Sequence, residues 1–206
     1  MALVDVRYRF TFVDIGSYGR ISDGGVFNSC SLSMAMQSQS LNVPAPSYLV
    51  QSATVPVPYV IVADDPFALQ TYLYKYLMKP YEAKQLTYEQ RIFNYRLSRA
   101  RRVVENSFGI MSSRFRVFSK AIALSPEKVQ VVIMAVCCIH NFLLRNPLAA
   151  AQYVPDQDDL TSDLEPIAGP QCGSRPTNEA RWVRDQFCSY SCSPAGAVPW
   201  QDSAVM

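Results

Sequence analysis

Short β-rich runs dominate the first part of the chain. Residues 2–6 and 10–15 are two such runs separated by a few polar positions, which is the pattern of an antiparallel hairpin. Residues 59–63 form a continuous apolar run, which predicts a strand buried on both faces and ending just before Asp64. The sequence after this strand favours a helix as far as about residue 78.

The middle of the chain has the strongest helical periodicity. Residues 87–113 predict one long helix with a buried apolar stripe, and a second helix is predicted over residues 127–145, with Ser125 as N-cap and Pro126 in its first position. This second helix is apolar nearly all round, so we expect it to be buried. The stripe of the first helix consists of Leu97, Ala100, Val104, Phe108 and Met111.

Charge is distributed unevenly behind a formal net charge of only +2. Residues 79–120 hold ten Lys or Arg against three Asp or Glu, whereas residues 146–206 hold three against eight and also seven of the fourteen prolines. We therefore expect two parts: a core over residues 1–145 and an acidic, Pro-containing tail over residues 146–206. The tail is expected to be poorly ordered, with one short helix possible at residues 178–189.

The basic stretch at residues 79–120 has two interpretations. It is either a solvated helical surface or a surface that faces a polyanion such as DNA, and its local excess of seven positive charges with interleaved tyrosines favours the second. No secretory signal opens the sequence. The longest apolar run, residues 129–144, is interrupted by polar residues and falls short of a membrane span, so no membrane association is expected.

Three carboxylates suggest chemistry. Asp64 and Asp65 follow a predicted buried strand, where sheets that contain parallel strands place ligands, but Asp before Pro66 is common in a turn with a helix cap, and the spacing alone favours that alternative. Glu105 lies on the predicted helix among arginines, where an ion pair with Arg101 is the structural alternative. Carboxylates of this kind hold Mg²⁺ or Mn²⁺, and two such ions about 3.5–4 Å apart cleave phosphodiesters.

The single histidine also has two interpretations. Next to Asn141, His140 could serve as a catalytic base, because the ordinary pKa of histidine lies near neutral pH. The other interpretation is structural, with the pair packing near the end of a helix, and the sequence favours it. Six cysteines without a CxxC pair, together with only one histidine, disfavour a zinc finger.

Five motifs in order resemble the PIF/Harbinger transposases and their domesticated relatives, the Harbinger transposase-derived nucleases of the DDE superfamily. The resemblance covers about residues 1–145. The motifs are Val13-Asp14-Ile15-Gly16; Gly19-Arg20-Ile21-Ser22-Asp23-Gly24-Gly25-Val26-Phe27; Tyr59 to Phe67 (YVIVADDPF); Asn94 to Glu105 (NYRLSRARRVVE); and Cys138 to Leu143 (CIHNFL).

The resemblance implies an α/β fold, an RNase H-like mixed sheet with flanking helices, that acts on DNA in the nucleus with Mg²⁺ or Mn²⁺ as cofactor. It assigns Asp64 and Glu105 as catalytic residues and as metal ligands, and Asp23 as a further ligand. It also implies a Myb-like (SANT) partner protein. The residues expected to contact DNA are Arg101, Arg102, Arg114 and Arg116.

The sequence departs from the family at its front. The family's first catalytic aspartate lies in an Asp-Gly motif on the first core strand, and the only Asp-Gly here, Asp23-Gly24, matches a later motif. We therefore expect an N-terminally truncated core that lacks its first strand, with low stability and little nuclease activity. The alternative is a non-enzymatic remnant that binds DNA or protein.

Overall fold

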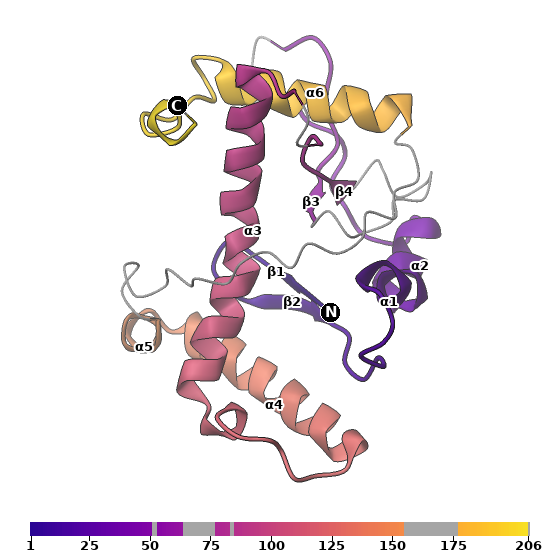
Figure 1. The fold of residues 1–206 in the computed structure, drawn as a ribbon, viewed down its shortest axis with the longest axis vertical. Coiled ribbons are helices and arrows are strands. Elements are labelled where there is room, and N and C mark those ends of the chain that lie inside the picture. Colours follow the sequence, from indigo (N-terminus) through magenta and orange to yellow (C-terminus); the bar gives the residue numbers. More distant parts are fainter. Residues whose placement is uncertain (51–52, 64–76, 83–84, 155–176, 206) are drawn as a thin grey trace. The chain divides into compact units, whose positions relative to one another are not determined.

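A computed structural model describes residues 1–50, 53–63, 77–82, 85–154 and 177–205 as a mixed α/β protein (Figure 1). Its contacts divide the chain into two units. Unit 1 comprises Met1–Ser22 and Arg102–Ala168, and unit 2 comprises Asp23–Arg101 and Gly169–Met206. The elements in chain order are β1 (Ala2–Val4), β2 (Phe10–Val13), α1 (Asp23–Ser29), α2 (Ser31–Gln37), β3 (Ile61–Val62), β4 (Leu77–Met78), α3 (Tyr88–Arg114), η1 (Arg116–Phe118), α4 (Pro126–Arg145), α5 (Pro147–Tyr153), α6 (Asn178–Cys192) and η3 (Asp202–Ala204).

Unit 1 is built on the hairpin that the sequence predicts. β1 and β2 pair antiparallel with Ala2 opposite Val13, and the register shifts between Leu3 and Val4. One face of α4 and the second half of α3 pack on the hairpin, because each places apolar residues there at helical spacing. The buried side chains of this core are Phe10, Met111, Val136 and Cys137.

Unit 2 contains a second small sheet. β3 and β4 are parallel, with Ile61 beside Leu77, and the N–H of Ala63 extends the pairing by donating to the carbonyl oxygen of Met78 at 3.1 Å. The first half of α3 and the C-terminal helix α6 pack beside this sheet. Their shared core holds Met78, Phe93, Leu97, Val183 and Cys188.

Two expectations about the strand region are wrong. The predicted strand at residues 59–63 is reduced to the two residues of β3, and its side chains are half-buried rather than buried on both faces. Where a helix was expected to end near residue 78, Leu77 and Met78 form a strand, because their backbone pairs with β3. Residues 64–76, which hold the rest of that predicted helix, lie outside the described residues.

The two long helices follow the predicted ranges, but their burial differs from the prediction. On α3, Leu97 and Met111 are buried as expected, whereas Ala100 is exposed and Phe108 is 42% exposed. The helix is buried toward its two ends, in two separate cores, so its middle needs no apolar stripe. On α4, only Val136, Cys137 and His140 are buried, so the expectation of a fully buried helix is wrong.

Among the described residues, α4 is the one helix long and apolar enough to cross a membrane. Core helices of ordinary globular proteins pass the same test of length and composition, so a single such helix is weak evidence. Two polar residues of α4, His140 and Asn141, are hydrogen-bonded to backbone atoms of the hairpin segment. A membrane-spanning position of α4 would break these bonds.

Candidate functional site

Glu105 is the best-described of the predicted metal ligands. It lies on α3, four residues after Arg101, and its side chain is exposed. The structure shows no ion pair or hydrogen bond between its carboxylate and a described residue, so the predicted pairing with Arg101 is not formed. The carboxylate is therefore available to a ligand.

The other two predicted ligands are placed less fully. Asp23 is the first residue of α1, and only its backbone is described. Asp64 follows Ala63 at the end of β3, but lies outside the described residues. Asp23 belongs to unit 2 and Glu105 to unit 1, so their meeting in one site stays a prediction.

The described residues alone do not make a metal centre. Within this part of the chain, no three side chains of His, Cys, Asp or Glu are grouped so that they could hold an ion. The carboxylate oxygens of the predicted set are the hard ligands that Mg²⁺ and Mn²⁺ prefer. A site for either ion would need Asp64, which lies outside the described residues.

The predicted DNA-contacting arginines have different surroundings. Arg102 on α3 and Arg116 on η1 are exposed. Arg101 is partly exposed. Arg114 is already engaged, because its Nε donates to the carbonyl oxygen of Tyr153 at 2.8 Å and one terminal nitrogen donates to that of Gln152 at 3.0 Å. Arg114 thus caps the C-terminal end of α5.

Arginines in the first half of α3 are bound by the C-terminal segment, residues 177–205. The Nη1 atom of Arg96 lies 2.5 Å from the carbonyl oxygen of Gly196 and 3.3 Å from that of Ser191. The guanidinium of Arg99 lies over the indole of Trp200, 4.3 Å from the ring centroid. Arg96 therefore donates hydrogen bonds within the protein, and the guanidinium of Arg99 stacks on a side chain of the protein.

The sequence interpretation missed this docking. It treated residues 79–120, which include Arg99, as a surface that faces solvent or a polyanion, and it found one possible helix in a tail otherwise expected to be poorly ordered. The helix is present as α6, three residues longer than predicted. The signal that could have found the contact is aromatic, because Trp200 also meets Tyr95 edge-on, with ring centroids 6.0 Å apart.

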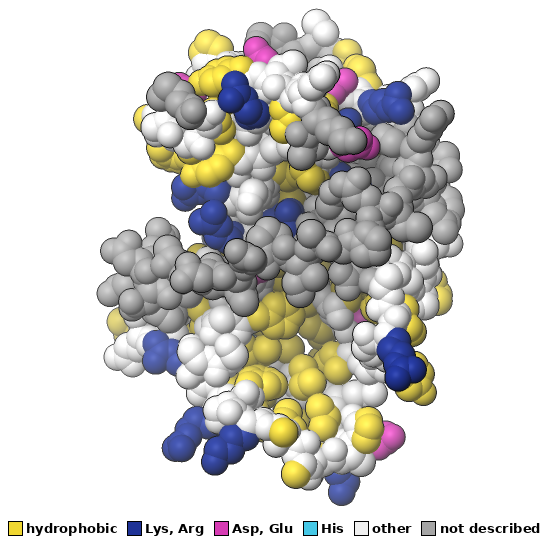
Figure 2. Space-filling model, in the orientation of Figure 1, with side chains coloured by type: hydrophobic (Ala, Val, Ile, Leu, Met, Phe, Trp, Pro, Cys, Tyr) yellow, Lys and Arg dark blue, Asp and Glu magenta, His cyan; other side chains and the backbone are white. Residues whose placement is uncertain are grey.

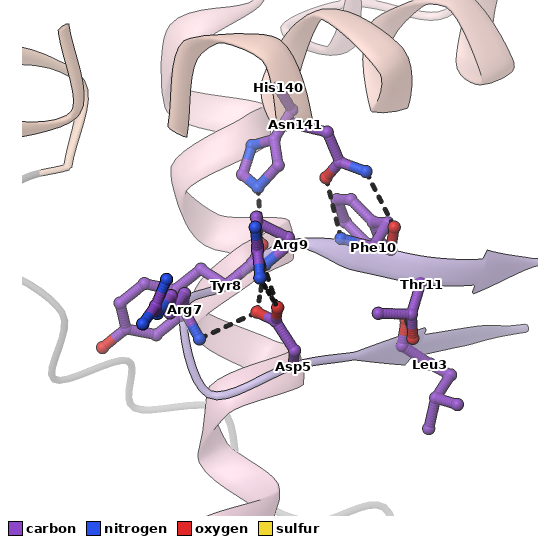
Figure 3. A network of polar contacts seen from close by, with 9 residues as sticks. All are labelled: Leu3, Asp5, Arg7, Tyr8, Arg9, Phe10, Thr11, His140 and Asn141. Carbon is purple, nitrogen blue, oxygen red and sulfur yellow. Dashed lines mark hydrogen bonds and ion pairs between the residues drawn. The ribbon is translucent and has the colours of Figure 1, made fainter. Parts of the chain in front are cut away.

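His140 and Asn141 form a polar anchor in unit 1 (Figure 3). The amide of Asn141 pairs with the backbone of Phe10 as a strand would: its Oδ1 accepts the Phe10 N–H at 2.8 Å and its Nδ2 donates to the Phe10 carbonyl oxygen at 2.7 Å. The buried ring of His140 lies 2.7 Å from the Tyr8 carbonyl oxygen through Nε2. The anchor confirms the structural interpretation of this pair.

The hydrogen bonds of His140 fix its proton. A carbonyl oxygen can only accept, so Nε2 carries the hydrogen, and Nδ1 accepts from the hydroxyl of Tyr153 at 2.7 Å. Burial lowers the pKa of His140 below its ordinary value. A neutral ring with both nitrogens occupied is not available as a general base.

The turn before Phe10 completes this anchor. Asp5 accepts the backbone N–H groups of Arg7 and Arg9 at 2.8 and 3.1 Å, and it forms an ion pair with the Arg9 guanidinium at 2.6 Å. Tyr8, inside the turn, has a φ of 63°, in the left-handed region that few side chains adopt. This conformation presents its carbonyl oxygen to His140 (Figure 3).

Comparison with known proteins gives one match. A family model described as "DDE superfamily endonuclease" matches residues 1–141, which include Asp23, Asp64 and Glu105. No curated protein and no solved structure matches the chain.

Proposed function

We propose that this chain is a transposase-derived domain that cleaves phosphodiester bonds of DNA. The chain belongs to the DDE superfamily endonucleases, and the proposal proceeds from that membership. The family match over residues 1–141 is the observation that carries this proposal. The order of the motifs in the sequence favours the PIF/Harbinger branch of the superfamily. An RNase H-like core is the fold that this membership favours.

In this proposal Asp23, Asp64 and Glu105 bind Mg²⁺ or Mn²⁺, and Asp64 and Glu105 are the catalytic pair. The observation that fits is the exposed carboxylate of Glu105, which makes no hydrogen bond or ion pair to a described residue. When bound, two such ions activate the attacking water and stabilise the leaving oxygen. The carboxylates of this chain contribute their negative charge and fix where the cations lie.

The arginines near Glu105 supply the contact with DNA. Arg102 and Arg116 are exposed. The N–H groups of their charged guanidinium groups can donate hydrogen bonds to phosphate oxygens. We assign Arg101 and Arg114 the same role, although Arg114 would share its guanidinium with the end of α5. Phosphate contacts give affinity without reading sequence, which fits dependence on a Myb-like (SANT) partner and a location in the nucleus.

We expect these 206 residues, tested on their own, to cleave DNA slowly. The 206 residues contain one Asp-Gly pair, Asp23-Gly24, which matches a later motif than the family's first catalytic aspartate. A metal site with fewer carboxylates holds its cations more weakly. A non-enzymatic module that binds DNA or protein is therefore the second candidate.

A plasmid-nicking assay with Mn²⁺ and Mg²⁺ tests the proposal. We expect slow nicking that Glu105→Gln abolishes and that Glu89→Gln, an exposed glutamate of the same helix, leaves unchanged. Calorimetric titration with Mn²⁺ should show binding that Asp64→Asn removes. DNA binding that is independent of metal, without nicking by the unaltered chain, would replace the nuclease by the second candidate.

A further inference from the structure

The side of α4 away from the hairpin is an apolar surface without a partner among the described residues. Figure 2 shows hydrophobic side chains gathered over this helix in the lower part of the view. Their spacing of three and four residues places them on one face over about three turns. We call this surface the α4 stripe; it consists of Val131 (70% exposed), Met134 (43%), Ala135, Cys138, Ile139 (47%) and Phe142 (72%).

We propose that the α4 stripe is the contact through which two copies of this chain pair, with their α4 helices antiparallel. Exposed apolar patches of this kind mark sites of protein association or membrane contact. The choice between these partners depends on the charges at the two ends of the stripe and on the order of side-chain sizes along it.

Opposite charges lie at the two ends of the stripe. Glu127 and Arg145 are both exposed and lie 18 residues apart, about five full turns, so they lie on the same side of the helix. In an antiparallel pair related by a two-fold axis, Glu127 meets the partner subunit's Arg145 on that side, and the reverse contact forms at the other end. The antiparallel arrangement also places the positive end of each helix dipole beside the negative end of the other, which is favourable.

The order of side-chain sizes is also self-complementary, in a register that differs from that of the charges by one residue, about 1.5 Å along the helix. With the two-fold axis level with the point between Val136 and Cys137, Val131 lies level with the partner subunit's Phe142, so the largest side chain meets a smaller one at each end. Ala135 lies level with the partner subunit's Cys138. Two small side chains at the centre allow the helix axes to approach closely.

A membrane explains these features less well. A helix lying on or in a bilayer gains nothing from a carboxylate at one end of its apolar face, whereas the antiparallel pair uses Glu127 at both ends. The opposite face of α4 is also held by His140 and Asn141, which bind the backbone of the hairpin segment. The stripe can therefore meet a second protein surface without any rearrangement of unit 1.

Sedimentation equilibrium of the full chain over a wide range of concentration tests the pairing. We expect a monomer–dimer equilibrium whose dissociation constant rises roughly tenfold or more for Phe142→Glu, because the pair would bury a charge without a partner. Val6→Glu is the matched control, since Val6 is 87% exposed in the turn of unit 1 and lies outside the stripe. Circular dichroism should show equal helix content in both variants.

A charge exchange separates this pairing from any other use of the stripe. Glu127→Arg and Arg145→Glu should each weaken the dimer, and the double variant should restore it toward the original affinity. A mass that stays monomeric at all concentrations would overturn the proposal, and so would a dimer that Phe142→Glu leaves unchanged. A chain that stays monomeric but co-sediments with phospholipid vesicles would assign the stripe to a membrane surface instead, provided that Phe142→Glu abolishes this co-sedimentation.

Discussion

Both units tie a long helix to a distant part of the chain through polar side chains, but they use different chemistry. In unit 1 the anchors are neutral: His140 and Asn141 of α4 bind the backbone at Tyr8 and Phe10. In unit 2 the anchor is a cation, Arg96 of α3, which binds backbone carbonyl oxygens of the C-terminal segment. Each anchor joins residues about a hundred or more positions apart.

The difference shows which positive charges remain for DNA. A count of the basic stretch treats every arginine as available to a polyanion, yet Arg96 and Arg99 are engaged within unit 2. Arg102 and Arg116 are exposed. The surface that could face phosphate is therefore smaller than the excess of charge suggests, and it is concentrated beyond the first half of α3.

The largest effect is expected from removal of the cationic anchor. Arg96→Met should lower the free energy of unfolding of unit 2 by about 2–3 kcal/mol, because the carbonyl oxygens of Gly196 and Ser191 lose a charged donor. Urea unfolding followed by tryptophan fluorescence measures it, since both tryptophans, Trp182 and Trp200, lie in unit 2.

Arg102→Met is the control for this loss, because it removes an exposed arginine of the same helix. It should change the free energy of unfolding by less than about 0.5 kcal/mol. Equal effects of the Arg96 and Arg102 variants would mean that the contacts of Arg96 with the C-terminal segment do not stabilise unit 2.

A smaller effect is expected from pH, and only in unit 1. Because burial lowers the pKa of His140 in the folded state, the unfolded state binds more protons. The stability that depends on this ring is therefore fully present above about pH 7.5, falls as the pH drops through the unfolded pKa of about 6.5, and levels off below the folded pKa. Tyr153, whose pKa burial raises to about 12, stays protonated throughout.

Hydrogen exchange of the hairpin amides at pH 7.5 and pH 5 measures this effect. Protection of unit 1, corrected for intrinsic exchange rates, should fall at pH 5. The tryptophan-detected unfolding of unit 2 should change little, because an arginine keeps its charge across this range. A loss of protection that persists in His140→Gln would assign the pH dependence to another group.

Local patterns predicted the elements of the fold better than their contacts. The hairpin and both long helices follow from alternation, helical periodicity and the Pro126 start, because these signals lie within each element. The pairing of β3 with β4 was missed, since each strand has only two residues and the partner lies across the chain. The docking of the C-terminal segment depends on contacts such as that of Arg96 with Gly196, which no local pattern encodes.

In the candidate site, too, local features could be predicted from the sequence, whereas contacts between distant residues could not. The exposure of Glu105 follows from its polar position on a predictable helix, and the structural role of His140 was also favoured by the sequence. Whether Asp23, Asp64 and Glu105 meet depends on packing between parts of the chain distant in sequence, so it stays a prediction. The exposed arginines could not be separated from the engaged ones without the structure.

The smallest effect concerns DNA affinity and compares one exposed arginine with one engaged arginine of α3. Arg102→Ala should weaken binding to duplex DNA and reduce the slope of log affinity against log salt by about 0.9, the value for one lost phosphate contact. Arg99→Ala should leave that slope unchanged, because its guanidinium lies over Trp200. Fluorescence anisotropy at several salt concentrations measures both slopes. Equal losses would mean that DNA displaces Trp200 from Arg99, so that the C-terminal segment competes with DNA for the first half of α3.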